Sequence, residues 1–385
     1  TWERALDSLL QKMLKTNRIE AIDNTLNQLF PSDLNAYDVL MDSVEAISES
    51  CPIEHEENGA TVKYDALLIA APILAWTRFA IASGPIAGEH VLTLSAHLAA
   101  HLLASDTHMA MVPQLFAIDQ LPRSYAEAAT LTQQLALASV KRTPLKAPPN
   151  NPDTVPFLAD TRYLLAVVLA PVGAPMFRWQ MAENQLNFIA DRAAALAQWR
   201  EQATPTVARL LPGCGVELLL PEAYYVACRE ADKQIRPISI RAAVNYLTQA
   251  LGVEAIELRA IIAGFGDELT DGQLEEYRVS FTLRHNDDVI YGIVWPFYGQ
   301  EDEEGTPAEA MPHGGIASTS TASRPLDVIL GLLAECGITS IKQHTERFPL
   351  EFCDDCGAPL FADADSELVH AEMPEDTPAS NEHFH

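Results

Sequence analysis

Basic residues are scarce in this chain. Its 385 residues include 25 lysines and arginines against 53 aspartates and glutamates, which gives a formal net charge of −28. Nucleic acids and anionic membranes attract proteins through basic surface. The scarcity therefore argues against direct binding to nucleic acid or to such a membrane. The acidic excess is first of all a source of solubility, and binding to a basic partner is the alternative.

Long apolar runs are also missing. A membrane-spanning helix needs about 20 apolar residues in succession, whereas the longest stretches here, such as residues 66–75, are shorter and contain proline. The opening residues Thr-Trp-Glu-Arg are not typical of a signal peptide. The six cysteines are scattered instead of forming a disulfide framework. We therefore expect reduced thiols and a cytoplasmic protein.

The sequence motifs of the common enzyme classes are absent. There is no Gly-Lys-Ser/Thr phosphate loop and no Gly-x-Ser-x-Gly nucleophile elbow, and Gly264-Phe-Gly266 is too short for a dinucleotide fingerprint. These absences lower the expectation of an enzyme and leave the question open.

The order of the predicted elements indicates an α/β protein. Residues 1–50 have apolar residues at helical spacing, and residues 52–60 read as a polar loop. Two related β-α-β-α units are expected over residues 61–140 and 161–252, with a proline-rich linker between them. The predicted strands are 64–74, 107–118, 162–172 and 216–226, and the predicted helices are 88–104, 124–139, 184–211 and 238–251.

The two units contain matching segments. Ala66-Leu-Leu-Ile-Ala-Ala-Pro72 and Leu165-Ala-Val-Val-Leu-Ala-Pro171 have the same length and a similar composition. The match predicts that both segments are buried strands and that the two units arose by internal duplication.

Residues 253–374 are predicted to form a third unit with a β-hairpin, a helix and a cysteine knuckle. Asn286-Asp287-Asp288 between two apolar runs is the hairpin signal. Residues 301–323 are acidic and then rich in glycine, serine and threonine, and residues 375–385 form an acidic tail, so both are expected to be disordered. The predicted strands are 255–263, 277–284, 289–298 and 339–346, and the predicted helix is 325–336.

The most distinctive motif is Cys353-Asp-Asp-Cys356-Gly357. Two thiols at this spacing followed by glycine are typical of half a zinc ribbon, because glycine permits a turn with φ > 0 in which backbone N–H groups point at the first sulfur. A redox pair is the alternative, but such a pair begins a helix, and Gly-Ala-Pro-Leu-Phe starts one poorly.

A closed structural zinc site needs four ligands. The candidates for the second pair are His344, on the incoming strand, and His370, which a hairpin turning at residues 363–366 places opposite Pro359. The alternative is a degenerate knuckle that holds no metal.

An arginine follows each of three predicted strand ends. Arg78, Arg178 and Arg229 lie six to eight residues after a proline near the strand end. Open α/β sheets bind ligands beyond the carboxyl ends of their strands, and arginines there could hold a carboxylate or phosphate. The alternative is that each arginine pairs with one of the many acidic side chains.

The run Glu351-Phe-Cys-Asp-Asp-Cys-Gly-Ala-Pro-Leu-Phe361, with Val369-His-Ala-Glu-Met-Pro-Glu375 after it, resembles a β-proteobacterial family known only as a domain of unknown function. The resemblance covers about 25 residues and implies a cytoplasmic bacterial protein without supplying an activity. Two functions remain. One is a non-catalytic regulatory or assembly protein that binds a protein partner or itself, and the other is an enzyme or sensor for a small anionic metabolite near the three arginines.

Overall fold

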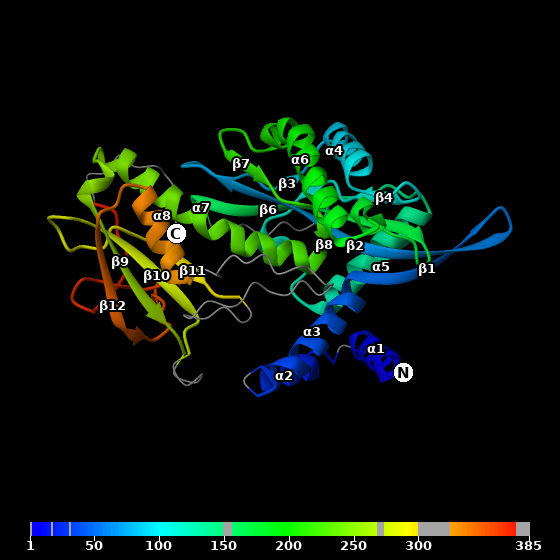
Figure 1. Cartoon of the computed structure of the whole chain (residues 1–385), viewed down its shortest axis with the longest axis horizontal. Helices are drawn as coiled ribbons and strands as arrows, with labels where there is room; N and C mark the ends of the chain where they lie inside the picture. The colour runs from blue at the N-terminus through cyan, green and yellow to red at the C-terminus, as the bar shows by residue number, and fades with distance from the viewer. Residues whose placement is uncertain are drawn as a thin grey trace.

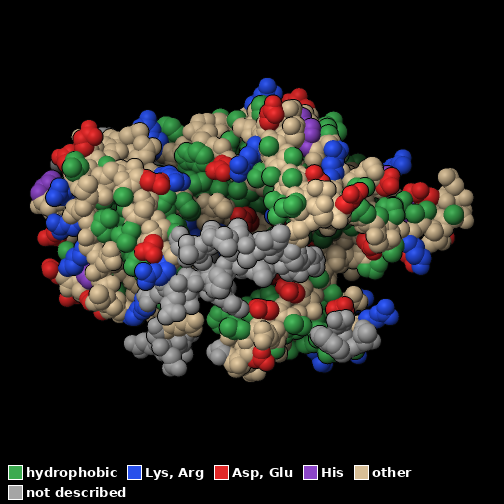
Figure 2. All heavy atoms as spheres, in the orientation of Figure 1, with side chains coloured by type: hydrophobic (Ala, Val, Ile, Leu, Met, Phe, Trp, Pro, Cys, Tyr) green, Lys and Arg blue, Asp and Glu red, His purple; other side chains and the backbone are tan. Residues whose placement is uncertain are grey.

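The computed structural model describes residues 2–16, 18–30, 32–148, 156–267, 273–298 and 324–374. They form a mixed α/β protein in which N-terminal helices precede a six-stranded and a four-stranded sheet (Figure 1). The predicted fold class is therefore confirmed. Figure 2 shows acidic side chains distributed over one face of the molecule instead of gathered into one patch. The disorder predicted for 301–323 and 375–385 falls outside the described residues.

Two long antiparallel strands form the centre of the larger sheet. Strand β2 (Ala60–Trp76) pairs with β6 (Ala159–Pro171). Leu68 lies opposite Val167, and each is the third residue of its matching segment. The two segments are therefore neighbours, related by a local two-fold axis.

Shorter strands extend this central pair on both sides. Strand β1 (Ser50–Glu57) pairs with the first half of β2, while β8 (Glu222–Ala223) and β7 (Gly215–Leu218) pair with its second half. On the other side, β4 (His108–Met111) pairs with β6. Thus the second strand of each predicted unit pairs with the first strand of the other unit.

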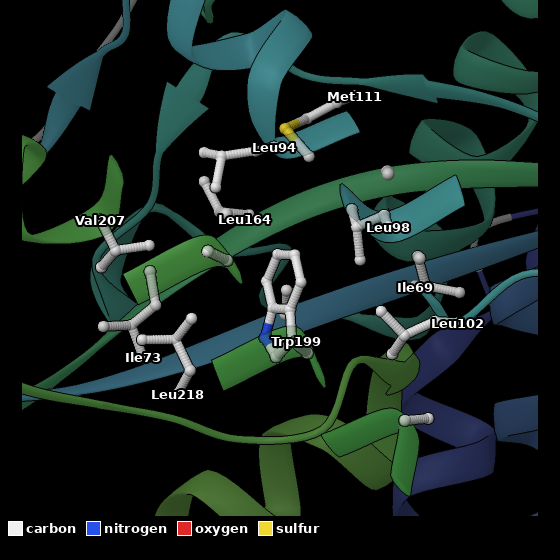
Figure 3. Packing of buried hydrophobic residues seen from close by; sticks show 14 of the residues in the cluster. Ile69, Ile73, Leu94, Leu98, Leu102, Met111, Leu164, Trp199, Val207 and Leu218 are labelled. Carbon is white, nitrogen blue, oxygen red and sulfur yellow. The ribbon is translucent and has the colours of Figure 1, made fainter. Parts of the chain in front are cut away.

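Alternate residues of the central strands face opposite layers of helices, as the two-residue period of a strand requires. Ile69 and Ile73 of β2 belong to one cluster with α4 (Gly88–His101) and α6 (Gln185–Leu210), in which Trp199 is fully buried (Figure 3). Leu68 and Leu74 belong to a second cluster with α5 (Tyr125–Val140) and the first half of α7 (Tyr224–Leu251). We call these the α4/α6 face and the α5/α7 face.

The N-terminal helices form a further layer on the α5/α7 side. They are α1 (Trp2–Lys15), α2 (Ile19–Leu29) and α3 (Leu34–Glu49), and their buried side chains include Leu10, Ile22 and Val44. Partly buried residues of α5 pack against the same cluster.

The smaller sheet has the order β11-β10-β9-β12. The predicted hairpin around Asn286 is confirmed, because β10 (Glu276–Leu283) and β11 (Tyr291–Pro296) are antiparallel neighbours. Strand β12 (Ser340–Phe348) runs parallel to β9 (Leu258–Phe265) after a crossover through α8 (Pro325–Glu335). The second half of α7 packs on this sheet, so one helix connects the two bodies.

Two predicted strands are wrong in part. The strand expected at 216–226 ends early, because α7 already begins at Tyr224. The helix expected at 238–251 therefore starts earlier than predicted, and Pro237 lies inside α7. The carbonyl of Lys233, which loses its usual partner to the proline, accepts a hydrogen bond from Arg236 Nε at 3.2 Å instead. The strand expected at 107–118 is divided at Pro113 into β4 and β5 (Gln114–Leu115), and β5 pairs with β3 (Gly84–Pro85).

The polar loop expected at 52–60 is also wrong. Strands β1 and β2 form a hairpin that turns at Asn58 and Gly59, whose φ angles are 50° and 80°. Asn-Gly is a strong signal for this type of turn. The strand expected at 255–263 starts later, because Ala255–Glu257 is a short 3-10 helix before β9.

Within the described ranges, no helix is both long and apolar enough to cross a membrane. The two longest, α6 and α7, have 26 and 28 residues and carry charged side chains along their length.

Candidate metal centre

The two thiols of the Cys-x-x-Cys motif lie on a tight loop. Gly357 has φ +73°, and its N–H donates to the carbonyl of Cys353 at 2.8 Å. The N–H of Cys353 donates in turn to the carbonyl of Ala358 at 2.7 Å, and Phe352 forms an isolated bridge with Pro359. The left-handed glycine turn predicted from the sequence is therefore present.

Backbone N–H groups of this loop point at the sulfur of Cys353. Hydrogen bonds from the N–H groups of Cys356 and Asp355 lower the pKa of the Cys353 thiol, because they stabilise its charged form. The thiolate is the form that binds metal ions.

Three metal-binding side chains meet at this loop. The donor atoms of Cys353, Cys356 and His370 all lie within 4.8 Å of one another, and Cys356 Sγ lies 3.2 Å from His370 Nε2. In a tetrahedral zinc site two sulfur ligands are about 3.8 Å apart. Small side-chain rotations would therefore let the three atoms coordinate one ion.

A short hairpin brings His370 to the thiols. Strands β13 (Phe361–Ala362) and β14 (Leu368–Val369) pair Phe361 with Val369. This register places His370 beside Leu360, whereas the sequence predicted that it would lie opposite Pro359. The turn is longer than expected, because the N–H of Asp363 donates to the carbonyl of Glu367 at 2.9 Å.

The second nitrogen of His370 faces a carboxylate. His370 Nδ1 lies 3.6 Å from Glu372 Oε1, which is too long for a hydrogen bond, and this buried nitrogen has no hydrogen-bond partner. Histidine ligands commonly donate their other N–H to a carboxylate, which fixes the ring for metal binding. A small rotation of either side chain would complete that contact.

His344 has other contacts. Its Nε2 donates to the carbonyl of Asp363 at 2.7 Å, and its Nδ1 lies 3.3 Å from the Ser366 hydroxyl. Both ring nitrogens therefore face the hairpin turn. Of the four predicted ligands, the structure brings together Cys353, Cys356 and His370.

A buried arginine, which the sequence analysis did not identify, anchors the cysteine loop. Arg278 of β10 is 1% exposed and donates from Nη1 to the carbonyls of Glu351 and Leu360, one on each side of the loop. Its guanidinium also pairs with Glu276 and stacks on Phe352. The only signal in the sequence is a single arginine in an apolar strand.

The three arginines predicted to hold an anion lie apart. Because β2 and β6 are antiparallel, Arg78 and Arg178 follow opposite ends of the paired strands. The paired part of β2 runs from Tyr64 to Trp76 and is about 40 Å long at the usual rise per residue. Arg178 donates from Nε to the carbonyl of Leu103 at 3.0 Å.

Arg229 lies on α7 and forms an ion pair with Glu45, as the alternative interpretation stated. Arg78 donates from Nη1 to Gln249 Oε1 at 3.2 Å. The three arginines therefore do not share one site.

Comparison with known proteins gives one result. No curated protein and no solved structure matches the chain. The family model described as "Protein of unknown function (DUF2863)" matches residues 1–384, which is nearly the whole length. The cysteine loop, its histidine and both sheets lie within that match, and the chain belongs to the DUF2863 family.

Proposed function

We propose that this chain is a non-catalytic regulatory or assembly protein of the β-proteobacterial cytoplasm, whose C-terminal unit is stabilised by a structural zinc ion. The observation that carries the proposal is the grouping of Cys353, Cys356 and His370 within 4.8 Å. Two thiolates and an imidazole are a donor set that suits zinc.

The position of the three donors supports a structural role for the metal. Cys353 and Cys356 precede β13, and His370 follows β14, so an ion bound to all three would tie the two ends of this hairpin together. Arg278 and Ser280 of β10 already hold the base of the hairpin, since Ser280 Oγ donates to the carbonyl of Ala362 at 2.9 Å. The fourth coordination position would be taken by water or by a further donor.

Metal content tests this proposal. Untagged protein purified without chelator is expected to contain about one zinc per chain by mass spectrometry, as a structural site would. Cys353→Ser and His370→Ala should lose the zinc, whereas His344→Ala should retain it. Zinc-free wild-type protein whose two thiols are freely alkylated would refute the metal site.

The regulatory or assembly role is supported by strands at the edges of the sheets. Strands β11 and β12 are the outer strands of the smaller sheet, and outer strands can pair with another chain. We therefore propose self-association or a protein partner. Light scattering combined with affinity purification tests this, and a strictly monomeric protein that brings down no partner would contradict it.

A further inference from the structure

A cleft of about 320 Å³ is lined by residues from the end of β2, the turn before β7 and the second half of α7. Its volume is at the lower end of the range for small-molecule sites. Leu158 lines it and belongs to the core of the smaller sheet, whereas Trp76 ends a strand of the larger sheet. The cleft is therefore at the junction of the two bodies.

The charge of this cleft is opposite to that of the whole chain. Among the described residues that line it, Arg78 is the one that is charged, and none is an aspartate or glutamate, although acidic residues outnumber basic ones in the chain by 53 to 25. Within the described part of the chain, no carboxylate lies within ion-pair distance of Arg78. The cleft is thus a local site of positive charge.

The polar wall of the cleft presents hydrogen-bond donors. Arg78 Nη1 donates to Gln249 Oε1 at 3.2 Å, and Gln249 Nε2 donates to Asn245 Oδ1 at 2.9 Å. Because arginine can only donate, it fixes the orientation of Gln249 and hence that of Asn245. Both amide oxygens are therefore used, and the N–H groups that remain suit a ligand group that only accepts, such as a carboxylate.

The cleft also has aromatic side chains, and the Arg78 guanidinium lies over the Phe79 ring, with its Cζ 5.5 Å from the ring centroid. Trp76, Phe79 and Tyr246 line the cleft, and Phe79 is 60% exposed. The Trp76 ring lies flat against the backbone of Gly215, where a Cβ atom would come within 2.3 Å of the ring. The glycine thus allows the indole to pack directly on β7 and to present an apolar surface to the cleft.

We propose that this cleft binds a small aromatic carboxylic acid, with its carboxylate on Arg78 and Asn245 and its ring against Trp76 and Phe79. A guanidinium binds a carboxylate through two parallel hydrogen bonds, and the aromatic side chains remove the ring from water. The site is separate from the cysteine loop, so it does not depend on the proposed zinc.

Binding of benzoate and of benzamide to the full chain tests the proposal. The two probes have nearly the same shape, and only benzoate carries a charge. By calorimetry and ligand-observed NMR, benzoate is expected to bind about tenfold or more tightly than benzamide, because hydrogen bonds to charged groups are the stronger ones. Equal affinities, or no binding of benzoate at any soluble concentration, would overturn the proposal.

Matched variants locate the site. Arg78→Gln should weaken benzoate about tenfold or more and leave benzamide unchanged, whereas Arg178→Gln, at the other end of the sheet, should change neither. Gly215→Ala should displace Trp76 and weaken both probes. Thermal unfolding verifies that each variant is folded. Benzoate binding that survives Arg78→Gln, or that Arg178→Gln weakens equally, would overturn the assignment.

Discussion

The two faces of the central sheet bury different chemistry. The α4/α6 face is filled by aliphatic side chains and aromatic rings around Trp199. On the other side, α3 covers the outer surfaces of α5 and α7. The residues buried between these helices are Glu45, Ser48 and Thr132, together with most of Glu49. The α4/α6 side thus has an apolar cluster around Trp199, with the ion pairs Arg162–Asp160 and Arg192–Glu222 as its buried charges, whereas the layer between α3, α5 and α7 is built from polar and titratable groups.

The difference follows from the N-terminal helices. A helix that covers a sheet normally exposes its outer side, where polar residues meet water. On the α5/α7 side, α3 lies over that outer side, and the N–H of Tyr225 on α7 donates to Glu49 Oε2 at 3.0 Å. Burial raises the pKa of Glu49 to about 7. A third layer therefore turns surface polar groups into interior ones, and Glu49 should make stability depend on pH through this side of the sheet.

The largest effect is expected on the apolar face. Trp199→Ala should lower the free energy of unfolding by about 3–5 kcal/mol, because it leaves a large cavity in a layer that cannot refill it. Its Nε1 has no hydrogen-bond partner, so Trp199→Phe should cost much less. Urea unfolding followed by circular dichroism should give the same loss at about pH 5 and about pH 8. A loss that depends on pH would contradict the view that the cluster around Trp199 is apolar.

Glu49→Gln should affect the polar face in the opposite direction. The pKa of Glu49 is raised from 4.5 to about 7, so the folded state binds its proton more tightly than the unfolded state does. Stability therefore falls as pH rises between these two values, and the penalty is complete above pH 7, where it amounts to about 3 kcal/mol. Glutamine removes the charge and keeps an acceptor for the Tyr225 N–H.

The variant is expected to unfold at higher urea concentration than the wild type at about pH 8 and at the same concentration at about pH 4. Glu56→Gln, at an exposed position of β1, is the matched control and should change neither value. Equal stability of Glu49→Gln and wild type at high pH would show that Glu49 reaches water.

Local patterns explain how much of this fold the sequence predicted. The apolar runs of β2 and β6 and the helical spacing before residue 50 are local, and these elements were found. That β2 and β6 pair antiparallel, and that α3 covers α5 and α7, depends on contacts between residues far apart in the chain. For the same reason the shared arginine site was wrong, because strand order in the sequence does not show at which end of the sheet each strand finishes.

The cysteine loop and the cleft beside Arg78 also differ in how far local sequence predicts them. Cys353 and Cys356 are a local motif and were recognised, but the position of His370 depends on a register that one extra turn residue shifts. The cleft was missed because Trp76, Leu158, Gly215 and Asn245 come from separate segments. Of the residues that line it, only Arg78 was proposed from the sequence.

A smaller effect is expected for the ion pair on the polar face. Burial raises the pKa of Glu45, and the hydrogen bond and charge of Arg229 lower it. Arg229→Met would leave the Glu45 carboxylate buried without its partner, and we expect a loss of about 1–2 kcal/mol, since Arg229 is itself partly exposed. The loss should shrink as pH falls, because a protonated Glu45 needs no partner. A double-mutant cycle with Glu45→Gln measures the interaction free energy between Arg229 and Glu45. A value of zero would show that this ion pair does not stabilise the polar face.

The smallest effect concerns a neutral contact between α5 and α3. Thr132 is fully buried, and the single proton of its hydroxyl is shared between the carbonyls of Ser48, at 3.0 Å, and Ala128, at 2.8 Å. The Ser48 carbonyl lies in the last turn of α3, where helix carbonyls lack partners within the helix. Thr132→Val keeps the shape and leaves that carbonyl unpaired, so we expect a loss of about 1 kcal/mol that does not vary with pH. Thr130→Val, at an exposed position of the same helix, should change stability by less than about 0.5 kcal/mol. If Thr132→Val varied with pH as Glu49→Gln does, the polar face would titrate as one network, and its pH dependence could not be assigned to Glu49 alone.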